Sequence, residues 1–301
     1  MNDQSNKSSS LMFKDSLMNA DDALAFLMDS AVASNQTETS SLDDSIGRIL
    51  AIDIHSKINV PGFDNSAMDG YTIALDENNT SKTNQSFDVV DRITAGSIGN
   101  ELKRGNAARI FTGAPIPKGA NTVVMQEECQ TSDDGSQITI KRAVELNENI
   151  RPTGNDILKD DVILTTGKKI EPQDISLAAS VGIGELRVFK RLKVGVFFTG
   201  DELIEPGNSL SPGKIYNSNR YALVALLNKA GCDVINLGNI KDNLDSTCVA
   251  LESLSSECDL IMTTGGVSVG EEDHVKPAVE KLGSLNLWKI KMKPGKPLAY
   301  G

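Results

Sequence analysis

The second half of the chain repeats one order of segments, an apolar strand, a loop and a helix, and this order constrains the fold more than any other feature. The apolar runs 193–199, 233–240 and 258–264 are nearly continuous, and helical periodicity follows each of them. A strand that is apolar on both faces is typical of a parallel sheet covered by helices on both sides. The chain from about residue 185 onwards is therefore expected to form a doubly wound α/β domain.

The first half of the chain has a different character. Apolar residues at helical spacing follow residue 19, and further helices are expected over 42–50 and from Pro172 onwards. Between about 56 and 145, short β-prone runs alternate with turns rich in Gly, Asn, Pro and Asp, which predicts a small antiparallel β domain. The simplest topology inserts this β domain into a helical one. The polar segment 1–14 is expected to be a disordered tail.

Composition limits the classes of function. The 301 residues include 30 Lys and Arg against 41 Asp and Glu, which gives a formal charge of −11. An acidic chain without a Lys/Arg-rich stripe lacks the electrostatic footprint of nucleic-acid or anionic-membrane binding. No apolar run approaches the length of a membrane span or of a secretory signal, so a cytoplasmic location is expected. The four Cys and two His show no metal-ligand spacing, so we expect free thiols and no zinc site.

Acidic residues follow all three expected parallel strands. Asp201 and Glu202 follow the first strand, Asp242 follows the second, and Asp273 follows the third together with two glutamates. Ligands of such sheets bind at the carboxyl ends of the strands. Carboxylates gathered there would repel one another unless Mg²⁺ holding a phosphate neutralised them. Helix capping is the alternative for each of these residues.

Two other segments could hold an anion. Gly265 and Gly266 lie in the loop after the third strand, where backbone N–H groups can approach a ligand closely, although a tight turn is the alternative. The loop has neither the dinucleotide-binding nor the P-loop spacing. The segment 289–296 gathers four lysines, including Lys293 and Lys296, and a solvated charged face is the alternative there.

Seven segments carry a resemblance to a known family. They read FDNSAMDGY (63–71), RIFTGAPIPKGANTVVMQEE (109–128), IRPTGNDI (150–157), TGDELIEPG (199–207), GKIYNSNRYAL (213–223), TTGGVSVGEEDHVK (263–276) and MKPGKPLAYG (292–301). By composition alone, the first two need be no more than ordered turns. Together the seven resemble the molybdopterin molybdenumtransferase family, which includes MoeA and the E domain of gephyrin. The resemblance extends from about residue 15 to the last residue.

The resemblance implies a multidomain α/β fold and a homodimer. A discontinuous helical linker domain at 15–55 and 146–184 would carry the inserted β domain at 56–145. A MogA-like three-layer α/β/α domain would follow at 185–301. It is expected to be truncated, because the chain stops at Gly301 without the GLPGNPVS segment and the C-terminal β barrel of the family. The incomplete sheet is expected to leave an exposed edge.

The family also implies a reaction, the last step of molybdenum cofactor biosynthesis. Molybdate is inserted into adenylylated molybdopterin with the help of Mg²⁺, and AMP is released. A MogA-type adenylyltransferase would act upstream, and molybdoenzyme apoproteins or chaperones would act downstream. The MogA type itself usually carries TGGTG, where this chain reads TGGVSVG. A non-catalytic scaffold of the same family, or an inactive fragment, is the alternative.

The resemblance assigns roles to individual positions. In the IRPTGNDI segment the family usually has Gly-Glu-Asp-Ile, and this chain keeps the aspartate as Asp156. Asp69 and Thr112 would reach the site from the β domain of a neighbouring copy. The implied catalytic residues are Asp69, Thr112, Asp156, Asp242 and Asp273, the implied substrate-binding residues are Gly265, Gly266, Ser268, Lys293 and Lys296, and the implied Mg²⁺ ligands are Glu202, Asp242 and Asp273.

Overall fold

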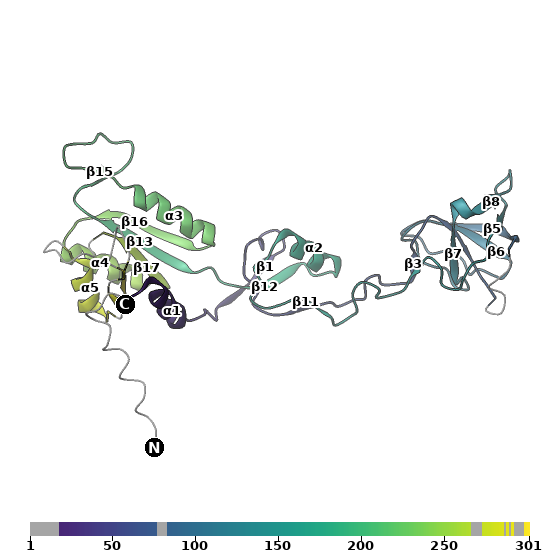
Figure 1. Cartoon of the computed structure of the whole chain (residues 1–301), viewed down its shortest axis with the longest axis horizontal. Helices are drawn as coiled ribbons and strands as arrows, with labels where there is room; N and C mark the ends of the chain where they lie inside the picture. Colours follow the sequence, from purple (N-terminus) through teal and green to yellow (C-terminus); the bar gives the residue numbers. More distant parts are fainter. Residues whose placement is uncertain (1–17, 77–82, 266–272, 286, 289, 292–297) are drawn as a thin grey trace, which may run out of the picture. The chain divides into compact units, whose positions relative to one another are not determined.

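The computed structural model describes residues 18–76, 83–265, 273–285, 287–288, 290–291 and 298–301 (Figure 1). The chain divides into two compact units. The α/β unit consists of Met1–Glu38 with Val188–Gly301, and the β unit consists of Thr39–Arg187. The tail expected at 1–14 lies outside the described residues. No helix in the described part of the chain is long and apolar enough to span a membrane.

A parallel sheet of three strands forms the centre of the α/β unit. The strand order is β16-β13-β17, and the strands are β16 (Asp233–Ile240), β13 (Lys193–Thr199) and β17 (Leu260–Thr264). β13 lies in the middle, and its residues from Val194 to Thr199 are all buried. Burial on both faces explains the continuous apolar run of this segment. The predicted parallel sheet is confirmed.

Helices cover both faces of this sheet (Figure 1). They are α3 (Ser218–Ala230), α4 (Leu244–Ser255) and α5 (Val275–Leu282), and Figure 1 shows α3 on one side and the other two on the opposite side. Phe198 of β13 packs with apolar residues of α3, whereas its neighbour Phe197 packs with Ala250 and Leu254 of α4. Because neighbouring side chains of a strand point to opposite faces, the single strand β13 contributes to two cores. The predicted three-layer arrangement is confirmed.

The α/β unit also contains the first helix of the chain. α1 (Ala20–Ser30) follows the expected helical spacing, and Ala23 packs with Met18 and Ile290. Phe26 of α1 lies edge-on to Tyr300, with ring centroids 6.0 Å apart. Tyr300 belongs to a small antiparallel pair formed by β18 (Leu287–Trp288) and β19 (Ala299–Tyr300). The expected helix is confirmed, and it packs within the α/β unit.

A sheet of six strands dominates the β unit. The order is β7-β4-β6-β5-β9-β8, and the strands are β4 (Gly70–Ile73), β5 (Gln85–Ile93), β6 (Asn106–Ile110), β7 (Thr122–Met125), β8 (Cys129–Thr131) and β9 (Gln137–Ile140). The expected antiparallel pairing holds for every neighbouring pair in this sheet except β5 and β6, which run parallel. The connection between them covers residues 94–105, and about a dozen residues suffice for a parallel crossover.

The rest of the β unit consists mainly of short strand pairs. The expected helix over 42–50 is wrong, because this segment forms turns and its backbone pairs with residues 168–170. The helix expected from Pro172 is confirmed, with Pro172 at its first position and Asp174 accepting the Glu171 N–H at 3.0 Å. The elements are β1 (Thr37–Ser41) paired with β12 (Glu185–Phe189), β2 (Ile54–His55) with β11 (Val162–Leu164), β3 (Asn65–Ser66) with β10 (Ile150–Arg151), and helix α2 (Pro172–Ser180). The boundary between the two units falls within β1 and β12.

The segments expected to form a helical linker domain therefore contain more strand and less helix than predicted. Local helical spacing was overridden there by backbone pairing between segments that are far apart in the sequence. The domain boundaries derived from the resemblance stay predictions. In the α/β unit, a further short parallel pair, β14 (Leu203–Ile204) with β15 (Ile215–Tyr216), lies in the segment between β13 and α3.

Candidate active site

Asp69 and Thr112 form a hydrogen-bonded pair in the β unit. Asp69 precedes β4 and Thr112 follows β6, and these strands pair antiparallel with Gly70 opposite Ile110. This register brings together two residues that are distant in sequence. The Asp69 Oδ1 atom accepts hydrogen bonds from the backbone N–H and from the hydroxyl of Thr112, both at 2.8 Å. The structure thus joins two residues that the resemblance assigns to catalysis.

These hydrogen bonds control the charge of Asp69. They lower the pKa of the Asp69 carboxyl below its ordinary value of 3.8, the backbone N–H of Thr112 having the largest effect, and the positive charge of Arg109 acts in the same direction. The side chain is exposed to solvent. In the described part of the chain, the Oδ2 atom of Asp69 accepts no hydrogen bond. Asp69 therefore presents one oxygen of a fixed, ionised carboxylate, which can attract a cation or accept a proton.

Arg109 supports the backbone next to Asp69, a role that no sequence pattern predicts. Its guanidinium group lies over the rings of Tyr71 and Phe111, 5.1 and 4.7 Å from their centroids. It donates a hydrogen bond to the Gly70 carbonyl oxygen at 2.8 Å and another to the side chain of Gln126. The Gln126 backbone N–H in turn donates to the Asp69 carbonyl oxygen at 3.1 Å. From the sequence alone, an arginine on a strand is expected to be a solvated charge, because the rings on which it stacks are identified only by the structure.

Replacing Thr112 by valine is expected to raise the pKa of Asp69. Valine keeps the backbone donor and removes the hydroxyl donor, so the pKa should move part of the way back towards 3.8. Because the pKa of Asp69 is lower in the folded chain than in the unfolded chain, the ionised carboxylate stabilises the folded state. This stabilisation is fully present above pH 3.8 and is lost as the pH falls through the folded-state pKa. A carboxyl ¹³C NMR titration measures the shift. Thr112→Ser, which keeps the hydroxyl, is the control, and an unchanged Asp69 pKa in the valine variant would contradict this assignment.

Asp156 lies on a loop that is fastened to the segment before Asp69. Its backbone N–H donates to the Val60 carbonyl oxygen at 2.9 Å, and its side chain accepts a hydrogen bond from Asn155 at 2.8 Å. Three residues earlier, Thr153 donates its backbone N–H and its hydroxyl to Asp64, at 2.7 and 2.9 Å. The Asp156 carboxylate itself is exposed.

In the α/β unit, the predicted residues lie where the parallel strands end. The buried hydroxyl of Thr199, the last residue of β13, donates to Asp242 Oδ1 at 2.6 Å. Gly265 follows β17 with φ +96°, and a Cβ atom there would lie 2.4 Å from the Thr199 carbonyl oxygen. Only glycine fits this close approach. The buried Oγ1 atom of Thr263, near the end of β17, has no hydrogen-bond partner among the described residues. An unpaired buried polar atom is typical of a place where a ligand or a water binds.

The three expected Mg²⁺ ligands all belong to the α/β unit. Glu202 is exposed and lies close to Gly200, and Asp273 is half-buried just before α5. Among the described residues, no three Asp, Glu, His or Cys side chains form a group that could hold a metal ion. Carboxylates are ligands of the kind that Mg²⁺ prefers, so Glu202, Asp242 and Asp273 stay predicted ligands. The four remaining predicted residues, Gly266, Ser268, Lys293 and Lys296, lie outside the described residues.

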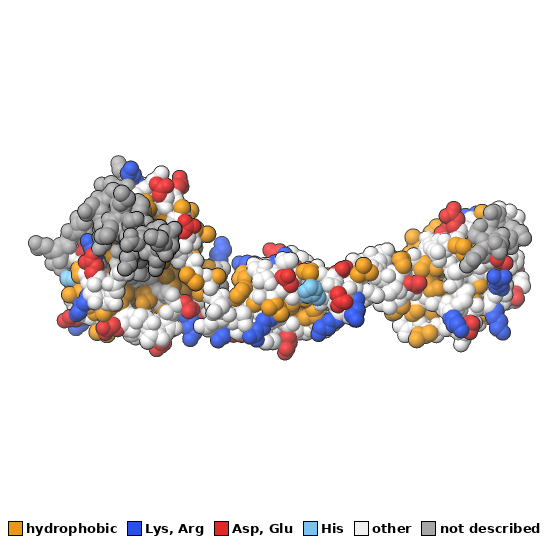
Figure 2. Space-filling view, turned by 90° about the horizontal axis from the view of Figure 1, so that it is seen from below, with side chains coloured by type: hydrophobic (Ala, Val, Ile, Leu, Met, Phe, Trp, Pro, Cys, Tyr) orange, Lys and Arg blue, Asp and Glu red, His pale blue; other side chains and the backbone are white. Residues whose placement is uncertain are grey.

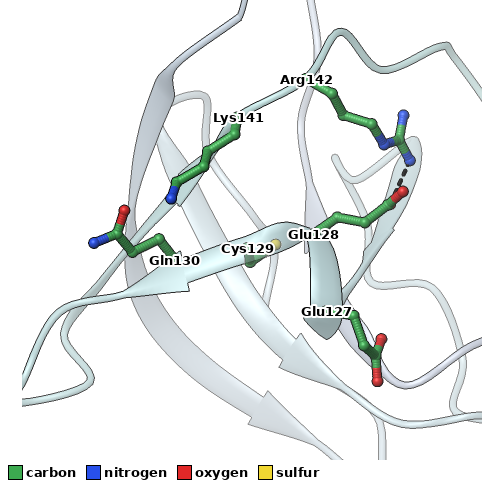
Figure 3. Close-up of a pocket in the computed structure, with 6 residues that line it drawn as sticks. All are labelled: Glu127, Glu128, Cys129, Gln130, Lys141 and Arg142. Atoms are coloured by element: carbon green, nitrogen blue, oxygen red, sulfur yellow. Dashed lines mark hydrogen bonds and ion pairs between the residues drawn. The ribbon is translucent and has the colours of Figure 1, made fainter.

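A pocket of about 290 Å³ lies around Cys129 in the β unit (Figure 3). Arg142 contacts Glu128 at 2.5 Å there and also pairs with Glu148. Burial, aided by the negative charge of Glu128, raises the pKa of the Cys129 thiol to about 11. A protonated thiol is neither a nucleophile nor a metal ligand at neutral pH. The pocket is lined by Glu127, Glu128, Cys129, Gln130, Lys141 and Arg142, none of which was a predicted site residue.

All four cysteines lie in the described residues and are free thiols, as expected. The surface charge also follows the composition. On the face drawn in Figure 2, acidic and basic side chains are interspersed over both units. A mixed surface of this kind agrees with the lack of a Lys/Arg-rich stripe in the sequence.

Comparison with known proteins defines the class as molybdopterin-related. Residues 18–182 match the family model of the MoeA N-terminal region (domains I and II), and residues 195–301 match that of a probable molybdopterin binding domain. The chain belongs to the molybdopterin molybdenumtransferase family. It is 43% identical over 286 residues to the molybdopterin molybdenumtransferase of Haemophilus influenzae, covering 95% of this chain and 70% of that protein.

Further relatives support this membership. The molybdopterin molybdenumtransferase of Bacillus subtilis is 39% identical, with 86% of this chain and 62% of that protein covered. A crystal structure of the molybdopterin biosynthesis MoeA protein of Pyrococcus horikoshii superposes with a TM-score of 0.82 at 32% identity, covering 95% of this chain and 72% of that one. The resemblance inferred from the seven segments is therefore confirmed, and so is the fold class. The chain spans about two thirds of the length of these relatives.

Proposed function

We propose that this chain takes part in the insertion of molybdate into adenylylated molybdopterin, with release of AMP and with dependence on Mg²⁺. Family membership supports a transferase step in molybdenum cofactor biosynthesis. The observation that carries the finer proposal is the Asp69 carboxylate, which Thr112 holds in one position and keeps ionised. Groups fixed in advance of substrate binding are typical of catalytic sites.

The charges of the substrates explain why several kinds of group are needed. Molybdate and the phosphates of adenylylated molybdopterin are all anionic, so they would be repelled by Asp69, Asp156 and Asp242 alone. Mg²⁺, when bound, would neutralise phosphate charge, and Glu202, Asp242 and Asp273 are the oxygen ligands that we propose for it. The ammonium groups of Lys293 and Lys296 and the loop at Gly265, Gly266 and Ser268 would bind the remaining anionic oxygens.

The candidate residues are divided between the two units. Asp69, Thr112 and Asp156 belong to the β unit, whereas Asp242 and Gly265 belong to the α/β unit. We propose a homodimer in which the β unit of one copy and the α/β unit of another complete each site. A MogA-type adenylyltransferase would supply the substrate in the cytoplasm, and molybdoenzyme apoproteins or chaperones would accept the product.

Measuring AMP release tests this function. The chain is incubated with adenylylated molybdopterin, and AMP is quantified by chromatography with and without molybdate and Mg²⁺. We expect AMP release to require both additions, and chelation of Mg²⁺ by EDTA should abolish it. Release at the same rate without molybdate, or no release with both additions, would contradict the proposal. In the second case a non-catalytic scaffold of the same family becomes the better description.

A further inference from the structure

We propose that Asp64 is a positioning residue that fixes the loop carrying Asp156 relative to the loop carrying Thr112. Asp64 has no assigned role, and it lies five positions before Asp69 in the same segment. The inference rests on the proposed function of Asp156 and Thr112, since positioning has a consequence for the rate only if those residues act on the substrate.

The side chain of Asp64 holds the first loop. Its Oδ1 atom accepts the backbone N–H and the hydroxyl of Thr153, at 2.7 and 2.9 Å. Two donors on one residue define both the position and the orientation of the backbone at Thr153. Asp156 follows in the same turn, and its backbone N–H is bonded to Val60, which also lies just before Asp64. Loss of the Asp64 carboxylate therefore removes the attachment three residues before Asp156 and leaves the loop held by backbone bonds alone, such as that of the Gly154 N–H to the Pro61 carbonyl oxygen at 2.9 Å.

The backbone around Asp64 holds the second loop. The Asp64 carbonyl oxygen accepts the N–H of Ile116 at 2.9 Å, and the Ser66 N–H donates to the Ala114 carbonyl oxygen at 3.0 Å. The Gly113 N–H donates to the Ser66 carbonyl oxygen at 2.8 Å. These three bonds attach the turn that begins at Thr112 to the same short segment. A shift of Asp64 is consequently transmitted to both loops.

The chain contains a matched control for this arrangement. Asp53 Oδ1 accepts the backbone N–H of Thr166 at 2.7 Å, and the Thr166 hydroxyl also bonds to this carboxyl. The two aspartates thus make the same kind of contact, with a threonine that is distant in sequence. Thr166 lies in the turn after β11, and none of the predicted site residues follows it in that turn. If the role of Asp64 were purely structural, replacing Asp64 or Asp53 would change kcat equally.

Two variants and a rescue test the proposal. Asp64→Ala is expected to lower kcat for AMP release by about 10- to 100-fold, because displacement of catalytic groups by a fraction of an ångström to one ångström has effects of this size. Asp53→Ala should leave kcat within about twofold. Asp64→Asn, whose Oδ1 can still accept both Thr153 donors, should restore most of the rate.

Hydrogen exchange provides a readout that does not depend on activity. In Asp64→Ala, the amides of Thr153, Asp156 and Gly113 should exchange about tenfold faster or more, while the amide of Thr166 is unchanged. In Asp53→Ala the pattern should be the reverse. If Asp64→Ala leaves kcat at the wild-type value, or if Asp53→Ala lowers it equally, positioning is contradicted. If the wild-type chain releases no AMP, the proposed function is contradicted. The coupling of the two loops is then tested by hydrogen exchange alone, and faster exchange confined to Thr153 in Asp64→Ala would contradict it.

Discussion

Replacing Asp69 by asparagine is expected to slow molybdate-dependent AMP release by about 10²- to 10⁴-fold, the range found when a residue that transfers a proton or stabilises charge is neutralised. Asparagine has the same size, and its Oδ1 atom can still accept both hydrogen bonds of Thr112. What it lacks is the negative charge of the exposed oxygen, which is the atom that would meet a cation or a proton. Initial rates at saturating substrate measure the effect on kcat.

The matched control is Asp53→Asn, because Asp53 makes the same contacts with Thr166. It should retain the wild-type rate, and both variants should melt at the wild-type temperature to within a few degrees, since both side chains are exposed. A rate for Asp69→Asn close to that of the wild type would remove Asp69 from the catalytic machinery.

Much of the fold could be predicted from local patterns. The three parallel strands of the α/β unit have continuous apolar runs because β13 is buried on both faces, and this signal does not depend on any other segment. The helix prediction for residues 42–50 was wrong for the opposite reason, because the structure of that segment depends on a distant one. Its short apolar pattern fits a helix, but Gly47 adopts φ +73° and the neighbouring backbone pairs with residues 168–170. Pairing with a distant segment leaves no local trace in the sequence.

The candidate site shows the same limit. By composition, Asp69 and Thr112 belong to ordered turns, and only the resemblance assigned them a common role. Their contact depends on the register in which β4 pairs with β6, and this register cannot be predicted from the local sequence of either strand. Arg109 and Asp64 were missed because a single charged residue on a strand or a turn is usually solvated. Their importance comes from partners that are distant in the sequence, Gly70 and Gln126 for Arg109, and Thr153 for Asp64.

Mixing two inactive variants tests whether two copies of the chain complete one site. Asp69→Asn alters the β unit and Asp242→Asn alters the α/β unit, so each variant alone should be inactive. In a dimer of one copy of each, one site would contain both substitutions and the other site neither. With random pairing, half of the dimers are mixed, and about a quarter of the wild-type activity is expected.

The decisive measurement is therefore the rate of molybdate-dependent AMP release by dimers that contain one copy of each variant. The two variants are co-expressed with different tags, and purification on both tags in turn isolates the mixed dimers. Those mixed dimers should show about half of the wild-type rate, because one of their two sites is intact. As a control, wild type paired with the double variant should be inactive, since both of its sites would be altered. Activity no higher than that of the separate variants, together with an active dimer of wild type and double variant, would contradict a site completed by two copies.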